Sequence, residues 1–235
     1  MKARPRLRAV LADYRPHYRV MDTAAVGVFG VLAAWSGARL VAHPEAGAWF
    51  IAIALLCGWV ATDLLSGLVH WAFDTWGSVH TPVLGKRFIR PFREHHWDPR
   101  AMTQHDFVEV AGSSCLAALP VLAACAWMPM PTRATVFAQA VSLFVALGVL
   151  VTNQCHKWAH LPAAQVPPPV RVAQRLRLIL HPDDHLRHHV RPYDSHYCTA
   201  SGWLNAPLHR LRLFRCLERL LSRLGGTPAR VDDLS

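Results

Sequence analysis

Four long apolar segments, separated by short polar or basic connections, dominate the chain. They cover residues 22–41, 46–73, 108–128 and 134–151. A helix needs about 20 residues to cross a bilayer, so each segment is predicted to be a transmembrane helix. Pro120 lies within the third segment and should kink it, which a helix bundle tolerates. We therefore expect an all-α integral membrane protein with four transmembrane helices.

The C-terminal part of the chain has a different pattern. Residues 208–224 alternate Leu, Phe and Arg at helical spacing. This predicts an amphipathic helix that lies on a membrane surface or against the protein. The first 20 residues are basic, but no short apolar core with a small-residue cleavage site follows them, and no cleaved signal peptide is expected. The whole chain, 1–235, is predicted to form a single membrane-embedded domain.

Composition supports the membrane interpretation. Of the 235 residues, 52% are hydrophobic and only 17% are charged, yet the formal net charge is +10. Soluble proteins carry about 25% charged residues. A soluble protein with buried helices is the alternative, and a nucleic-acid binder would also be basic, but such uninterrupted apolar runs favour neither. The six cysteines form no CxxC pair and are expected to be small buried side chains.

The distribution of positive charge predicts which side of the membrane each connection faces. The N-terminal arm, the connection after the second span and the C-terminal tail are rich in Lys and Arg. The loop 43–49 has neither, and the loop 129–131 has only Arg133 beside it. By the positive-inside rule, both termini and the second connection face the cytoplasm. The Ala- and Arg-rich composition suggests a bacterial inner membrane.

Fifteen histidines are present, and most of them fall on the predicted cytoplasmic side. Nine lie at the ends of the second and fourth spans, in the second connection and in the tail. These nine are His70, His95, His96, His105, His156, His160, His185, His188 and His189. The other six, expected to be surface groups, are His17, His43, His80, His181, His196 and His209. Four distant segments thus bring histidines to one membrane face, which predicts a histidine-rich cytoplasmic cap.

The spacing of these histidines indicates metal ligation. His156 and His160 are four residues apart and share one face of a helix. His185 with His188 and His189 places two imidazoles on one face and the third on the flank, where it suits a neighbouring ion. Nine neutral imidazoles can hold two metal ions with open positions, and imidazole suits zinc, copper or iron.

Carboxylates near these histidines are expected to orient the imidazole N–H groups. The candidates are Asp63, Asp74, Glu94 and Asp106. Asp63 lies within a predicted span, where an ionisable group is costly and usually faces the bundle interior. It either hydrogen-bonds a ligand or reaches water, and the first interpretation is favoured.

Several stretches around the histidines are shared with one family. They are Ser66–Trp71, Asp74–Gly77, Arg90–His96, Asp98–Pro99, Met102–Phe107 with Glu109, Thr152–Gln154, His156–His160, His185 with His188–Val190, Gly202–Asn205 and Pro207–Leu208. In these stretches the chain resembles the plasmanylethanolamine desaturase family, whose relatives include a plant plastid desaturase of lipid-bound palmitate. The resemblance covers roughly residues 60 to 210, in the same order.

The resemblance implies a four-span enzyme with two iron ions held by histidines and O2 as co-substrate. The implied reaction introduces a double bond next to the ether oxygen of an alkyl-glycerophospholipid, with electrons from a cytochrome b5 or ferredoxin type of carrier. The nine histidines map onto family histidines, and Asp74 falls on the family's acidic position, a catalytic candidate. Asp184 stands where animal members carry a further histidine, and it could replace that ligand or support one.

Other functions use similar features. An acyl-lipid desaturase or hydroxylase would use the same di-iron scaffold. A membrane haem carrier would need facing histidines inside the spans, whereas these cluster at span ends. A non-catalytic membrane protein that binds metal is a further alternative. A zinc intramembrane protease is disfavoured because the chain has no HExxH motif.

Overall fold

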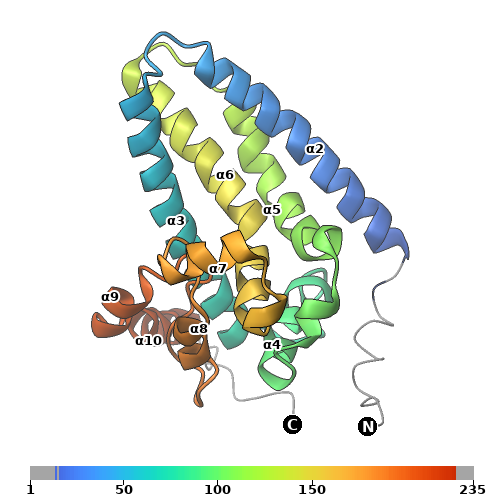
Figure 1. Ribbon diagram of the computed structural model, residues 1–235. Helices are drawn as coiled ribbons and strands as arrows, with labels where there is room; N and C mark the ends of the chain where they lie inside the picture. The colour runs from blue at the N-terminus through green and yellow to red at the C-terminus, as the bar shows by residue number, and fades with distance from the viewer. Residues whose placement is uncertain (1–13, 15, 226–235) are drawn as a thin grey trace. The chain divides into compact units, whose positions relative to one another are not determined.

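The computed structural model describes residue 14 and residues 16–225, and all regular structure in this part of the chain is helical. Four helices are long and apolar enough to cross a membrane (Figure 1). They are α2 (Pro16–Val41), α3 (Ala48–Thr75), α5 (Phe107–Trp127) and α6 (Arg133–His160). The prediction of an all-α protein with four spans is thereby confirmed. Most of the basic N-terminal arm (Lys2, Arg4, Arg6, Arg8 and Arg15) lies outside the described residues.

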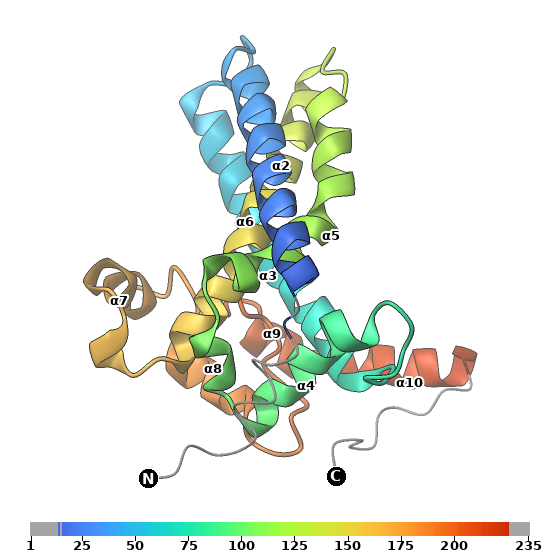
Figure 2. The same cartoon turned by 90° about the vertical axis from the view of Figure 1, so that its right-hand side faces the viewer.

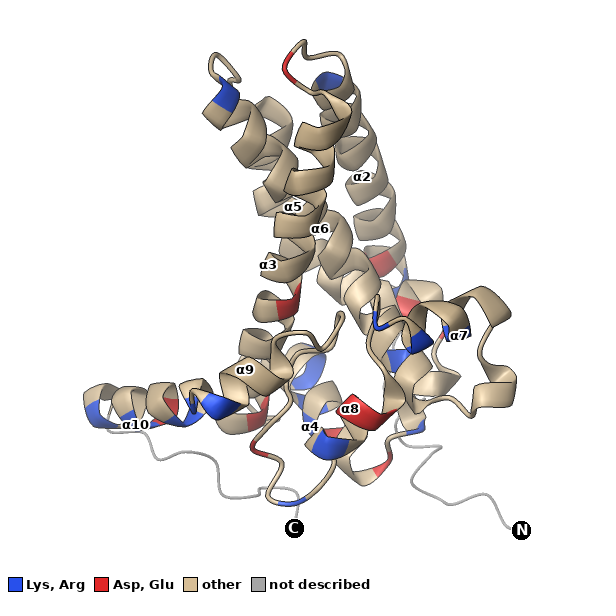
Figure 3. Ribbon diagram, turned by 60° about the vertical axis from the view of Figure 1, so that its left-hand side comes forward, with Lys and Arg blue, Asp and Glu red and all other residues tan. Residues whose placement is uncertain are grey.

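The four long helices carry apolar side chains on their exposed faces as well as on the faces that pack inside the protein. Val31, Trp49 and Ile53 are 70%, 85% and 54% exposed. Charged side chains are sparse along the long helices and gather on the shorter ones (Figure 3). A long helix that is apolar all round satisfies its own backbone and suits a lipid environment. The chain is therefore an integral membrane protein.

The chain divides into two compact units. The first comprises residues 1–59 and 103–154, and the second comprises residues 60–102 and 155–235. The first unit contains α2, the beginning of α3, α5 and most of α6. The second contains the ends of α3 and α6 together with the shorter helices.

In the first unit, α2 runs along α5 (Figure 2). A Cβ atom on Gly112 would lie 2.3 Å from Cβ of Asp22, so only glycine permits this approach. Asp22 is buried and accepts a hydrogen bond from the Tyr14 hydroxyl at 2.6 Å. Gly112 thus allows the two helices to approach closely, and the buried Asp22 between them is hydrogen-bonded.

The second unit is built from short helices joined to the ends of α3 and α6. They are α4 (Arg90–Trp97), α7 (Pro168–Arg175), α8 (Pro182–His188), α9 (Asn205–Arg210) and α10 (Leu213–Gly225), with a π-helical turn at Gly85–Ile89 before α4. α10 covers most of the predicted amphipathic segment. Its beginning packs on α3, where the Phe214 and Trp71 ring centroids are 5.8 Å apart.

The stretch 195–205, here called the 195–205 segment, is irregular up to the first residue of α9 and covers one face of α3. Oδ1 of Asp63 accepts hydrogen bonds from the backbone N–H groups of Ser201 and Gly202 at 2.8 and 2.9 Å. Its Oδ2 accepts from the N–H of Leu204 at 3.0 Å. Asp63 is fully buried and anchors this segment, rather than contacting a histidine as expected from the sequence.

Candidate metal centre

Eight of the nine predicted histidine ligands belong to the second unit, and four helices bring them together. His70 comes from the end of α3, and His95 and His96 come from α4. His156 and His160 lie on the last turns of α6, and His185, His188 and His189 lie on or directly after α8. They form two groups in which all ligand atoms lie within 4.8 Å of one another.

The first group has its ring nitrogens pointing at one another. It contains His95, His156, His160, His185 and His189. Nε2 of His185 lies 2.7, 2.8 and 3.0 Å from Nε2 of His156, His160 and His189, respectively. Imidazoles around one tetrahedral ion, with bonds of about 2.0–2.1 Å, would have nitrogens roughly 3.3 Å apart. The four nitrogens therefore converge as ligands of a single cation do.

The second group surrounds a carboxylate. It contains His70, His95, His96 and His188. Oδ2 of Asp74 lies 3.1 Å from Nε2 of His96 and 3.4 Å from Nε2 of both His70 and His188. Three imidazole nitrogens and one carboxylate oxygen thus approach a common point.

His95 belongs to both groups. Successive residues on a helix point about 100° apart, so His96 on α4 reaches only the second group, whereas His95 lies between the two. His185 on α8 and His189 directly after it are four residues apart and join the first group, whereas His188 turns to the second. The shared member makes the two groups adjoin.

Backbone carbonyls fix the orientation of three of these rings. Nδ1 of His70 donates to the carbonyl oxygen of Tyr197 at 3.1 Å, and Nδ1 of His188 donates to that of Ser195 at 2.9 Å. Nδ1 of His95 donates to the carbonyl oxygen of Phe92. Each bond leaves the Nε2 lone pair for a metal, the usual arrangement of a ligating histidine.

The chemistry of the donor set fits metal ions. Burial, followed by the neighbouring imidazoles, holds the pKa of His95 and of His185 well below its usual range, so both rings are neutral. Nε2 of His95, His70 and His188 and Oδ1 of Asp74 are buried and have no hydrogen-bond partner among the described residues. Buried ring nitrogens and a buried carboxylate oxygen without hydrogen-bond partners are costly, and a bound cation would compensate them.

Arg93, which the sequence analysis did not single out, links two of the contributing helices. Its side chain on α4 is fully buried. Nε donates to the carbonyl oxygen of Phe73 at 3.2 Å, and Nη2 donates to those of Trp76 and Gly77 at 3.1 and 2.7 Å. The last carbonyls of a helix lack partners within it, so one guanidinium here caps α3 and holds α4 against it. The sequence feature that could have identified Arg93 is its position three residues before His96, on the same helix.

Other predicted residues have different contacts. Neither group includes His105, which lies in the first unit with Nδ1 3.0 Å from Oε2 of Glu109. Asp106 caps α5 and pairs with Arg19. Glu94 pairs with Arg90, and Asp184 pairs with Arg177. His17, His43, His80, His181, His196 and His209 belong to neither group.

Comparison with known proteins gives a consistent result. A family model described as a lipid desaturase domain matches residues 59–232. Plasmanylethanolamine desaturase of Myxococcus xanthus is 44% identical over 99% of this chain and 83% of its own length. Plasmanylethanolamine desaturase 1 of Mus musculus is 41% identical over 78% of this chain and 69% of its own.

A plant protein is more distant. Chloroplastic fatty acid desaturase 4 of Arabidopsis thaliana is 34% identical over 75% of this chain and 54% of its own length. No solved structure matches. The extent of the family match and the near full-length identity lead to one conclusion: the chain belongs to the lipid desaturase family and is an oxidoreductase.

Proposed function

We propose that the protein is an O2-dependent di-iron desaturase that converts alkyl-ether phospholipid to vinyl-ether phospholipid. The observation that carries the proposal is the pair of adjoining histidine groups that share His95. The substrate is supported by 44% identity, over nearly the whole chain, to a relative named plasmanylethanolamine desaturase. The plasmanyl headgroup is proposed to be phosphoethanolamine on the same basis.

The reaction removes two hydrogens from adjacent carbons of the alkyl chain. One O2, two electrons and two protons are consumed with them, and two waters are released. Acidic and basic side chains cannot oxidise an unactivated methylene, and bound iron supplies this chemistry. The contribution of this chain is to hold both ions, fix their geometry and position the lipid.

Eight histidines and Asp74 are the proposed ligands. Asp74 would supply an oxygen to the ion that His70, His96 and His188 would hold, which accounts for the burial of its carboxylate among their Nε2 atoms. An anionic ligand lowers the net charge of a cation held by neutral imidazoles. His105 belongs to neither group and remains a predicted ligand from its position in the sequence and from the family resemblance.

The depth of the centre suits attack near the glycerol linkage. His70 lies near the end of α3, and His156 and His160 lie near the end of α6. A lipid's first chain carbons lie close to its headgroup, at this boundary of the bilayer. We propose that this boundary is cytoplasmic and that the membrane is the bacterial inner membrane, because basic residues follow α3 and α6.

Lipid mass spectrometry tests the proposal. A host that lacks plasmalogens is supplied with alkyl-ether lipid and expresses the wild type or the His95→Ala variant. We expect acid-labile vinyl-ether lipid with the wild type and none with the variant. New unsaturated or hydroxylated acyl chains in place of vinyl ethers would keep the oxidoreductase and discard the ether substrate. The observation that supports this second candidate is the 34% identity to the plant fatty acid desaturase.

A further inference from the structure

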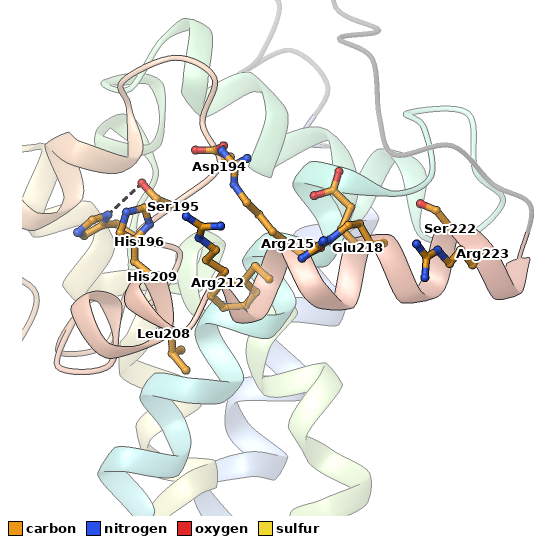
Figure 4. A pocket seen from close by; sticks show the side chains of 12 residues that line it. Asp194, Ser195, His196, Leu208, His209, Arg212, Arg215, Glu218, Ser222 and Arg223 are labelled. Carbon is orange, nitrogen blue, oxygen red and sulfur yellow. Dashed lines mark hydrogen bonds and ion pairs between the residues drawn. The ribbon is translucent and has the colours of Figure 1, made fainter.

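A groove with an arginine-rich wall lies beside the metal centre in the second unit. It has a volume of about 880 Å³ and is formed by α10, the end of α9 and residues 194–196 (Figure 4). Its charged lining consists of Arg212, Arg215, Arg219, Arg223, Asp194 and Glu218. Arg215 pairs with Asp194. Four guanidinium groups against two carboxylates leave the groove cationic.

The helix that carries these arginines is strongly two-sided. Arg215, Arg219 and Arg223 recur every four residues and are exposed on one side of α10. Leu220, Leu221 and Leu224 occupy the other side and are 52%, 43% and 74% exposed. A helix of this kind buries its leucines at the hydrocarbon boundary and turns its arginines toward water. The groove is then accessible from the aqueous phase rather than from the lipid.

The groove borders the metal centre directly. Ser195 lines it, and the backbone carbonyl of Ser195 accepts the hydrogen bond from Nδ1 of His188 at 2.9 Å. Phe214 lines it as well, and its ring centroid is 4.9 Å from that of Tyr197. Tyr197 in turn lies 5.1 Å from the His188 ring. One residue and one hydrogen bond thus separate the solvent-facing groove from a proposed ligand.

We propose that this groove docks an acidic one-electron carrier protein, which delivers electrons beside His188. The inference rests on the proposed function, because each double bond formed needs two electrons that the lipid does not supply. A carrier that transfers one electron at a time must dock twice per turnover, so rapid and reversible association is required. Complementary surface charge provides this, because it accelerates encounter without a large buried contact.

The test uses iron-loaded protein in nanodiscs of neutral lipid. The Arg219→Glu/Arg223→Glu variant reverses two groove charges, and the Arg171→Glu/Arg175→Glu variant on α7 is the matched control, also an i,i+4 pair. Binding of an acidic ferredoxin or cytochrome b5, whichever supports wild-type turnover, is titrated without O2 at several salt concentrations. Vinyl-ether formation is measured with the reduced carrier in the presence of O2, and separately by adding O2 to protein that has been reduced with dithionite and freed of the excess.

We expect the groove variant to weaken carrier binding by about tenfold or more at low salt and to flatten its salt dependence. The KM for the carrier rises, while dithionite-driven product and the KM for lipid stay at wild-type values. The α7 control changes binding far less, and Arg219→Lys/Arg223→Lys retains most of it.

Three outcomes overturn the proposal. If the groove variant raises the KM for lipid under dithionite, the groove binds a lipid headgroup instead. An equal loss of carrier binding in the α7 control would show that the effect comes from the overall charge of the protein and not from the groove. A wild type that binds neither carrier in a salt-sensitive way would exclude the docking site. Failure of the proposed function is distinguishable, since the wild type would then form no vinyl ether even with dithionite.

Discussion

His70 donates its Nδ1 proton to the backbone carbonyl oxygen of Tyr197 at 3.1 Å, across 127 residues of sequence. The 195–205 segment therefore helps to orient the histidines of the candidate metal centre. Its Ser195 carbonyl oxygen also accepts a hydrogen bond from Nδ1 of His188. Because the segment is tied to α3 through Asp63, the orientation of these imidazoles depends on how closely segment and helix fit. Groups that orient a ligand affect metal affinity almost as strongly as the ligand does.

Gly67→Ala tests this fit. A Cβ atom at this position would lie 2.6 Å from Sγ of Cys198, in the 195–205 segment. We expect destabilisation of about 1–3 kcal/mol in detergent, together with weaker iron retention, because the segment must move away from α3. Gly30→Ala in α2 is the control, since a Cβ atom there meets nothing within 4 Å. Adding Cys198→Ala should recover part of the loss, and strict additivity in this double-mutant cycle would refute the close contact.

Arg93→Lys tests the link between α3 and α4. A lysine ammonium cannot reproduce the planar fork that contacts the carbonyls of Phe73, Trp76 and Gly77. We predict an iron affinity lower by roughly tenfold or more, because His95 and His96 shift with α4. Competition with a chelator measures it. Arg171→Lys on α7 should leave the affinity unchanged, and an unaltered affinity in Arg93→Lys would contradict the positioning role.

Metal stoichiometry tests the division into two groups. The wild type is expected to hold about two irons per chain, and His189→Ala or His96→Ala about one, because each removes a ligand of a single ion. His95→Ala should hold less than either, since His95 belongs to both groups. Elemental analysis of purified protein gives the count, with His43→Ala as the control. Retention of both irons in His189→Ala and His96→Ala would argue against two separate ions.

The cap of α5 should make the stability of the folded protein depend on pH. Asp106 accepts hydrogen bonds from Arg19 and from the backbone N–H of Glu109, in that order of importance, and its pKa is lowered. A depressed folded-state pKa stabilises the protein fully above the unfolded value, near 4, and the contribution is lost as pH falls below it. The Tm difference between wild type and Asp106→Asn should shrink from pH 6 to pH 3. Because the pair is exposed and screened by solvent, its contribution is small.

The transmembrane helices could be predicted from the sequence because a long apolar segment is compatible with few other structures. The end of α6 was predicted less well: the helix continues to His160, past the apolar run, where hydropathy carries no signal. The histidines were identified because four separated segments carry them on one predicted side. Their division between two groups depends on how α4 and α8 are turned in space, which spacing constrained only within each helix.

The supporting contacts could not be predicted for a different reason. Carbonyl oxygens of Phe92, Ser195 and Tyr197 orient three imidazoles, and every residue has such an oxygen, so no side-chain pattern marks them. Asp63 was noticed as an ionisable group in a span, but its backbone partners lie more than 130 residues away. Only the folded second unit brings them together.

The position of the new double bond tests the central claim most directly. An alkyl-ether phospholipid carrying deuterium on the first two carbons of its alkyl chain is bound to iron-loaded protein that has been reduced with dithionite and freed of the excess, and O2 is then added. We predict a vinyl-ether product that has lost one deuterium from each labelled carbon, identified by mass spectrometry, and no product with His188→Ala. A product that retains all the deuterium, with its double bond elsewhere or in an acyl chain, would contradict ether-lipid desaturation at this centre.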